Sequence, residues 1–325
     1  MTTHHTMHHN GPLDVVTIGE AMAMFIARET GDLAAAETFV KRAAGAELNV
    51  ATGLARLGLK VGWVSRIGDD AFGRFICQQL EKEGIDHACV TVDKRYPTGF
   101  QLKSKVDDGS DPLVEYFRKG SAASHLSVDD FDADYFGSAR HLHLSGVAAA
   151  LSESSLALLK HTAKEMRARG KTISFDPNLR PVLWRSEEEM RKQLNLLADL
   201  PFQLTVENDQ TEHGRLAPSV AFFTAVREAD LPISMTFDMG NWRWTGEDAD
   251  QAAQQLAAQV GYVHVKAAVP HQDSFRAIAL DEADDHWRTL LQQLPAQAPR
   301  GIEFPLEGDD LTAVTRHYVS LLRNV

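Results

Sequence analysis

Four side chains that can bind a metal ion recur along the last third of the chain. Glu207, Asp238, His264 and Glu303 follow one another at spacings of 31, 26 and 39 residues, each at or near the end of a short apolar run. One βα unit takes about 30 residues, so each unit would deliver one such side chain at the carboxyl end of its strand. A lone acid after a strand is usually a helix cap, but three carboxylates and an imidazole in a regular series predict a divalent metal site. The ion could be Mn²⁺, Mg²⁺ or Zn²⁺, because the residue types do not choose among them.

Short apolar runs and helical periodicities predict the elements that position these residues. The strands expected in the last third are 202–206, 233–237, 262–265 and 301–304, and the helices are 219–229, 249–260, 281–293 and 312–324. The strands expected before them are 15–18, 61–67, 98–105, 141–144 and 172–175, and the helices are 46–57, 72–83, 154–169 and 186–200. This alternation predicts an α/β fold with a mostly parallel sheet covered on both faces.

Four segments in the last third resemble one known family. LTVENDQT, MTFDMGNW, YVHVKA and GIEFPLEG are similar to the second half of the sugar phosphate isomerase/epimerases with a xylose isomerase-like barrel, over residues 200–325. The resemblance implies that Glu207, Asp238, His264 and Glu303 are metal ligands. It also implies half of a (β/α)8 barrel, because the family barrel has eight such units and four are visible here.

The chemistry of that family suits these residues. A bound ion would hold the oxygens of a keto sugar and polarise its carbonyl. Glu207 and Glu303 are then the candidate catalytic pair that removes and returns the proton α to the carbonyl. Lys266 is the candidate that stabilises the developing negative charge, and an ordinary surface lysine is the alternative.

The first two thirds resemble a different family. GAELNVA at 45–51, RIGDDAFG at 66–73, PTGFQLK at 97–103, YFRKGSAAS at 116–124 and DPNLRPVLW at 176–184 are similar to segments of the PfkB-type carbohydrate kinases. Within that family, these segments are nearest to 2-keto-3-deoxygluconate kinases. The resemblance spans residues 14–199 and implies a ribokinase-like three-layer fold with lid strands.

That resemblance also implies a sugar-binding site. Gly45, Ala46 and Asn49 would contact sugar hydroxyls, since small residues let the backbone approach a ligand and an amide both donates and accepts hydrogen bonds. Tyr116 and Arg118 would approach the sugar from the lid strands. Arg180 would face a substrate carboxylate, a role that suits a planar bidentate donor. Surface ion pairing is the alternative for the two arginines.

The kinase pattern is incomplete in this sequence. Phosphoryl transfer in the family relies on a Gly-Ala-Gly-Asp loop, which supplies an anion-binding turn and an aspartate base. The printed sequence contains no such segment, and Gly308-Asp309 follows the last predicted strand without small residues around it. We therefore expect three domains in sequence: a disordered leader at 1–13, an incomplete kinase-like domain at 14–199, and the half barrel at 200–325.

Composition limits the classes of partner. The formal net charge of −12 over 325 residues argues against nonspecific binding to nucleic acid or an anionic membrane. Two cysteines and no long apolar run are typical of a cytoplasmic protein. We expect a small sugar or sugar acid as the ligand. The strand at 98–105 could form a homodimer, and a solvated hairpin is the alternative for it.

Three functions remain open from the sequence. The main hypothesis is a metal-dependent sugar isomerase or epimerase joined to a sugar-binding, kinase-like domain. The first alternative is an ATP-dependent kinase of the 2-keto-3-deoxygluconate type, with ATP as its cofactor. The second is a non-catalytic sugar-binding pseudoenzyme or a product of gene fusion.

Overall fold

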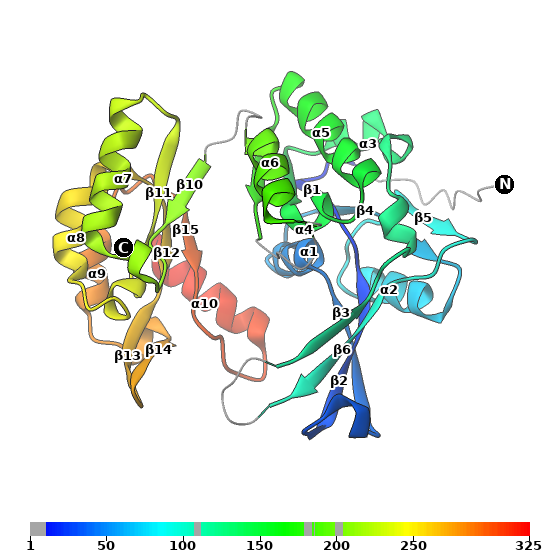
Figure 1. Cartoon of the computed structure of the whole chain (residues 1–325), viewed down its shortest axis with the longest axis horizontal. Helices are drawn as coiled ribbons and strands as arrows, with labels where there is room; N and C mark the ends of the chain where they lie inside the picture. Colours follow the sequence, from blue (N-terminus) through cyan, green and yellow to red (C-terminus); the bar gives the residue numbers. More distant parts are fainter. Residues whose placement is uncertain (1–10, 107–111, 179–183, 185, 199–203) are drawn as a thin grey trace. The chain divides into compact units, whose positions relative to one another are not determined.

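The computed structural model describes residues 11–106, 112–178, 184, 186–198 and 204–325. Residues 1–10 of the predicted leader lie outside this description. The chain divides into two compact units, 1–202 and 203–325, which are described separately (Figure 1). No helix in the described ranges is both long enough and apolar enough to cross a membrane.

Unit 1 is built on a five-stranded parallel sheet with the order β5-β4-β1-β8-β9. Its strands are β1 (Val15–Ile18), β4 (Val61–Gly68), β5 (Val90–Asp93), β8 (His141–Ser145) and β9 (Thr172–Asp176). Successive side chains of a strand point to opposite faces, and both faces of this sheet are apolar. Val61 and Trp63 pack in one buried cluster, whereas Val64 packs in another. A strand such as β1 is therefore apolar along its length, because both of its faces are covered.

Helices cover this sheet on both sides. They are α1 (Ala46–Arg56), α2 (Ala71–Lys82), α3 (Ala133–Ser138), α4 (Gly146–Ala149), α5 (Glu153–Ala168) and α6 (Glu187–Ala198). Leu48 of α1 and Ile76 of α2 share the cluster of Trp63, and Leu159 of α5 shares that of Val64. Ser186 caps the start of α6, because the Glu189 backbone N–H donates to its hydroxyl at 3.1 Å.

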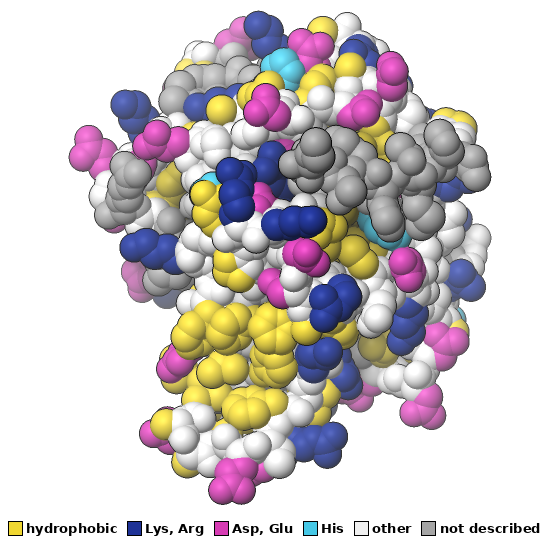
Figure 2. All heavy atoms as spheres, turned by 90° about the vertical axis from the view of Figure 1, so that its right-hand side faces the viewer, with side chains coloured by type: hydrophobic (Ala, Val, Ile, Leu, Met, Phe, Trp, Pro, Cys, Tyr) yellow, Lys and Arg dark blue, Asp and Glu magenta, His cyan; other side chains and the backbone are white. Residues whose placement is uncertain are grey.

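A second, four-stranded sheet of unit 1 forms the lid predicted from the sequence. Its order is β3-β2-β6-β7, with β2 (Met22–Thr30), β3 (Phe39–Ala44), β6 (Phe100–Lys105) and β7 (Val114–Phe117). On one face Phe25, Phe100 and Phe117 form an aromatic cluster with Phe72 of α2. Phe117 is 45% exposed, and Figure 2 shows a hydrophobic area over the part of unit 1 that holds these strands. The self-association expected of β6 stays a prediction.

Unit 2 contains a four-stranded parallel sheet with the order β10-β11-β12-β15. Its strands are β10 (Leu204–Glu207), β11 (Ile233–Asp238), β12 (Val260–Val265) and β15 (Arg300–Ile302). Its helices are α7 (Leu216–Glu228), α8 (Ala249–Leu256), α9 (His286–Gln292) and α10 (Leu311–Arg323). One continuous buried cluster, which includes Phe237, Trp242 and Trp287, joins the sheet to these helices.

The structure corrects two expectations for unit 2. The predicted half barrel is not shown: in the described part of the chain the sheet is open, with β10 and β15 at its edges. Barrel closure requires the edge strands to pair, and these two do not. An antiparallel hairpin of β13 (Ala267–His271) and β14 (Ser274–Ile278) also stands between β12 and α9. The helix predicted from residue 281 begins instead at His286, because a short 3-10 turn covers Leu280–Glu282.

Candidate functional site

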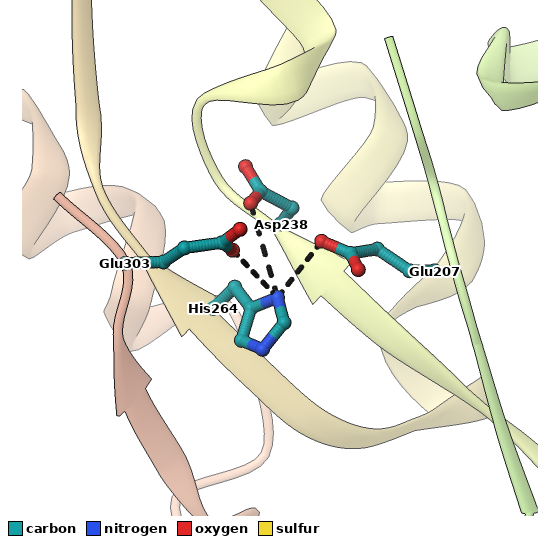
Figure 3. Close-up of side chains that lie close together, drawn as sticks. All are labelled: Glu207, Asp238, His264 and Glu303. Carbon is teal, nitrogen blue, oxygen red and sulfur yellow. Dashed lines mark hydrogen bonds and ion pairs between the residues drawn. The ribbon is translucent and has the colours of Figure 1, made fainter. Parts of the chain in front are cut away.

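The parallel sheet of unit 2 brings its four predicted metal ligands to one edge. Glu207 and Asp238 are the last residues of β10 and β11, His264 lies near the end of β12, and Glu303 follows β15. Asp238 is in register with His264 on the neighbouring strand. Figure 3 shows Glu207 and Glu303 pointing at the imidazole from opposite sides, with Asp238 also directed toward it. The sequence spacing therefore reflects convergence in space.

The imidazole Nδ1 of His264 is the centre of this cluster. It lies 2.8 Å from Glu207 Oε1, 2.7 Å from Glu303 Oε2 and 4.0 Å from Asp238 Oδ2. Burial by itself would lower the pKa of His264, but the hydrogen bonds and charges of the two glutamates outweigh it and raise the pKa to about 10. Without a metal ion, the imidazole is therefore a protonated cation shared by two carboxylates.

Asp238 is held more rigidly than its neighbours. It is fully buried, and its Oδ1 accepts the backbone N–H groups of Gly240 and Asn241 at 2.8 Å each. Its Oδ2 lies 2.9 Å from the ammonium of Lys266, which is only 6% exposed. Burial raises the pKa of Asp238, as does its contact with Glu303, and Lys266 opposes this. Lys266 is thus the buried partner of an acid, contrary to the surface-lysine alternative.

Sequence reasoning missed Asn208, the residue that fixes the strand end carrying Asp238. Its side-chain oxygen accepts the Asp238 N–H at 2.8 Å, and its side-chain amide donates to the Asp238 carbonyl at 3.0 Å. Asn208 is 2% exposed. Its position directly after Glu207 was the available signal, because a polar side chain at a strand end commonly binds the neighbouring loop.

The cluster fits a divalent metal ion. One ligand atom from each of its four residues lies within 4.8 Å of all the others. Ligand atoms that share one ion lie up to about 4 Å apart, because each metal–oxygen or metal–nitrogen bond is about 2.0–2.2 Å. Three carboxylates with one imidazole form a hard, anionic donor set of the kind such ions prefer. Small side-chain movements would suffice for Glu207, Asp238, His264 and Glu303 to hold the ion.

Unit 1 has a pocket beneath the other face of its lid sheet, with a volume of about 400 Å³. Gly45, Ala46, Asn49, Tyr116 and Arg118, all predicted to bind sugar, line this pocket. Arg180, the sixth predicted residue, lies outside the described residues. A side chain at Gly45 would place its Cβ 2.5 Å from the Glu20 carbonyl, so the close approach of α1 to this loop requires glycine.

Four polar residues of the pocket were not identified from the sequence. Glu20, Gln101, Lys103 and Asn178 line it together with the predicted set. Glu20 lies 2.6 Å from Arg118 through its Oε2 and the guanidinium Nη2. The contact joins residues almost a hundred positions apart, so no local sequence pattern could reveal it. Asp176 caps the loop after β9, because its carboxylate accepts the Asn178 N–H at 2.8 Å.

Charge distinguishes the two sites. The unit 1 pocket offers the cations Arg118 and Lys103 and the single acid Glu20. The unit 2 cluster offers three acids against one imidazole and the ammonium of Lys266. The first arrangement suits a small organic anion with hydroxyl groups, and the second suits a cation.

Comparisons with known proteins concern mainly unit 1. Residues 12–215 match the family described as pfkB family carbohydrate kinase. A 2-dehydro-3-deoxygluconokinase of Bacillus subtilis (strain 168) is 51% identical over 189 residues, which are 58% of this chain and 58% of that protein. The chain thus spans less than two thirds of the length of the curated relatives that it matches.

Solved structures show the same likeness. A PfkB protein from Polaromonas sp. JS666 superposes with a TM-score of 0.62 and 46% identity, over 69% of this chain and 76% of that one. An uncharacterized sugar kinase from Pyrococcus horikoshii in complex with ATP gives a TM-score of 0.57 and 26% identity, over 70% and 71% of the two chains. These matches support a ribokinase-like α/β fold. They do not support the predicted C-terminal isomerase or epimerase domain, because the proteins described above are kinases or PfkB proteins.

Proposed function

This chain belongs to the PfkB family of carbohydrate kinases, and on that premise we propose that it acts in carbohydrate metabolism as a sugar-acid kinase of the 2-dehydro-3-deoxygluconokinase type. The observation that carries the proposal is the pocket beneath the lid sheet, where two cations stand among groups suited to sugar hydroxyls. The 51% identity to a relative named for this substrate supports the choice of a 2-keto-3-deoxy sugar acid.

The pocket residues differ in which groups of a sugar acid they can bind. Asn49, near the start of α1, and Gln101 of β6 offer amides that donate to and accept from hydroxyl groups. Arg118 and Lys103 offer positive charge to the carboxylate of the acid. Tyr116 is 44% exposed and contributes a ring that can cover a sugar face. Arg180 stays a predicted carboxylate ligand.

ATP would supply the phosphoryl group of the proposed reaction. One solved relative is a complex with ATP. Without a metal ion the acid-rich cluster of unit 2 would repel the phosphates of a nucleotide. The printed sequence has no Gly-Ala-Gly-Asp segment either. No residue of this chain is therefore assigned to the nucleotide, and the proposal concerns the sugar acid.

Calorimetry and an enzyme assay test this proposal together. Titration of the full chain with 2-keto-3-deoxygluconate should show saturable binding, which Arg118→Gln should weaken by about 10- to 100-fold through loss of a charge-assisted contact. Addition of ATP with Mg²⁺ then shows whether the bound acid is phosphorylated. Phosphorylation would support the complete kinase proposal, whereas binding without it would confine the role to sugar-acid binding. Absence of binding would contradict the proposal.

A second candidate function is favoured by the cluster of unit 2. We propose that Glu207, Asp238, His264 and Glu303 bind one divalent metal ion, since their ligand atoms already lie within 4.8 Å of one another. Proton transfer by Glu207 and Glu303, with charge stabilisation by Lys266, stays a prediction from the isomerase resemblance. Titration with Mn²⁺, followed by electron paramagnetic resonance, should show one bound ion that is lost in His264→Ala. Equal Mn²⁺ binding by that variant would contradict this site.

A further inference from the structure

A buried ion pair stands at the wall of the unit 1 pocket. The side chain of Glu20, just after β1, is 1% exposed, and that of Arg118, just after β7, is 10% exposed. Their closest atoms, Glu20 Oε2 and Arg118 Nη2, are 2.6 Å apart, and both residues line the pocket. Burial of two charges costs free energy that their attraction only partly offsets, so such a pair often serves orientation more than stability.

The carboxylate of Glu20 is itself fixed in place. Its Oε1 accepts the Ser121 hydroxyl at 2.5 Å, and Ser121 donates its backbone N–H to the Arg118 carbonyl at 3.0 Å. A Cβ at Gly99 would lie 2.7 Å from Oε1 and 3.4 Å from the Cβ of Arg118. The glutamate is thus enclosed on all of these sides, and it has little freedom to release the guanidinium.

The pair leaves donors of Arg118 unused. A guanidinium has five N–H groups, and Nη2 meets Glu20 Oε2 as an ion pair at 2.6 Å rather than through an aligned hydrogen bond. Nε is buried without an acceptor among the described residues. The ring of Tyr116, 6.0 Å from the guanidinium carbon, bounds the arginine on the lid side. Arg118 therefore lines the pocket in a fixed orientation and still has hydrogen-bonding capacity.

We propose that Glu20 is a positioning residue that holds the Arg118 guanidinium in the orientation that receives the carboxylate of a sugar acid. Through this contact Glu20 determines specificity for an acid over an uncharged sugar. The inference rests on the proposed sugar-acid function. A planar fork binds a carboxylate well only at a set angle, so the geometry of the fork matters as much as its charge.

Electrostatic repulsion between Glu20 and an acid would predict the opposite effect, and an experiment can separate the two roles of Glu20. If Glu20 only neutralised Arg118, its removal would free a positive charge and tighten the binding of an acid. If Glu20 positions Arg118, its removal weakens the binding of the acid and leaves that of an uncharged analogue unchanged. The sign of the change in affinity therefore distinguishes the two roles.

The experiment compares 2-keto-3-deoxygluconate with its uncharged carboxamide by calorimetry on the full chain. Glu20→Gln should weaken acid binding by about 10- to 100-fold while carboxamide binding stays within about twofold. Ser121→Ala, which keeps the charge and frees one oxygen, should give a smaller loss in the same direction. Glu20→Asp is the second variant in case Glu20→Gln does not fold, and it should also lose preference for the acid.

Glu47→Gln is the matched control, because Glu47 is equally buried and hydrogen-bonds to the Ser145 hydroxyl and the Ala148 N–H, so that it acts on Arg118 only through its charge and not through contact. It should keep the preference for the acid. Unchanged or tighter acid binding by folded Glu20→Gln would overturn the inference and leave the proposed function standing. A wild-type chain that binds neither ligand would overturn both.

Discussion

The candidate sites of the two units each contain a buried ion pair, but they differ in the balance of charge around it. In unit 1 the acid Glu20 is matched by Arg118 at 2.6 Å, and the pocket retains a further cation, Lys103. In unit 2 the acids outnumber the fixed cations: Lys266 pairs with Asp238, while His264 is shared by Glu207 and Glu303. Charge balance therefore separates the candidate site for an organic anion from the candidate site for a metal ion.

The largest expected effect concerns Asp238. Asp238→Ala should lower the free energy of unfolding of unit 2 by about 3–5 kcal/mol, because the buried Lys266 would lose its closest partner and keep only Glu303, at 3.8 Å. Denaturant unfolding followed by tryptophan fluorescence measures this, since Trp242 and Trp287 are buried in the core of unit 2. Asp309→Ala, at an exposed site, is the control. Equal free energies of unfolding for the two variants would contradict the claim that Asp238 stabilises the buried Lys266.

A divalent ion should act on unit 2 alone. Mn²⁺ at about 100 times its dissociation constant should stabilise that unit by about 2.7 kcal/mol, because the ion binds only the folded state. Glu207→Gln should reduce this gain and His264→Ala should abolish it. Thermal unfolding, with unit 1 as the internal control, provides the measurement. An equal stabilisation of unit 1 by Mn²⁺ would show that the effect of the metal is not specific to the unit 2 cluster.

A pH effect is expected in unit 1, at the sheet rather than at the pocket. Burial lowers the pKa of His143 to about 4, with His141 acting in the same direction and Asp176 against it. In the unfolded chain His143 takes up a proton near its ordinary pKa of 6.5, whereas in the folded chain it does so only near pH 4. The folding stability that is present above pH 6.5 is therefore lost as the pH falls toward 4. The loss should reach about 2–3 kcal/mol. His143→Gln should flatten this part of the stability profile, and an unchanged profile would assign the effect to other groups.

The smallest expected effect concerns a neutral contact in the pocket. Asn49→Ala should weaken binding of the sugar acid by about fivefold, equivalent to about 1 kcal/mol for one neutral hydrogen bond. The carboxamide should lose the same factor, because a hydroxyl contact does not depend on the carboxylate. Calorimetry with both ligands checks this, and a loss confined to the acid would mean that Asn49 acts through charge.

Local patterns predicted much of this fold. β1, β4, β8 and α2 were identified by apolar runs and helical periodicity, which depend only on neighbours in sequence. β2 and β3 were missed, because their place depends on the antiparallel pairing of Ala23 with Ala43 and on the parallel pairing of β2 with β6. The hairpin of β13 and β14 was also missed, because Pro270 argues against a strand.

The two sites also differ in how far the local sequence predicts them. The unit 2 cluster was predictable because each ligand follows its own strand at a regular spacing. Glu20 was not, because its role depends on Arg118 and Ser121, which lie far along the sequence. The family match runs to residue 215, whereas the structure pairs β10 with β11 inside unit 2. Residues 204–207 thus belong to the family match by sequence similarity, but to the sheet of unit 2 by packing.

The most direct test of the account is calorimetric titration of the full chain with 2-keto-3-deoxygluconate, beside Arg118→Gln. We expect saturable binding of the acid by the wild-type chain and a loss of about 10- to 100-fold in the variant. Absence of binding by the wild-type chain, or equal binding by the variant, would contradict the claim that the unit 1 pocket recognises a sugar acid through its arginine.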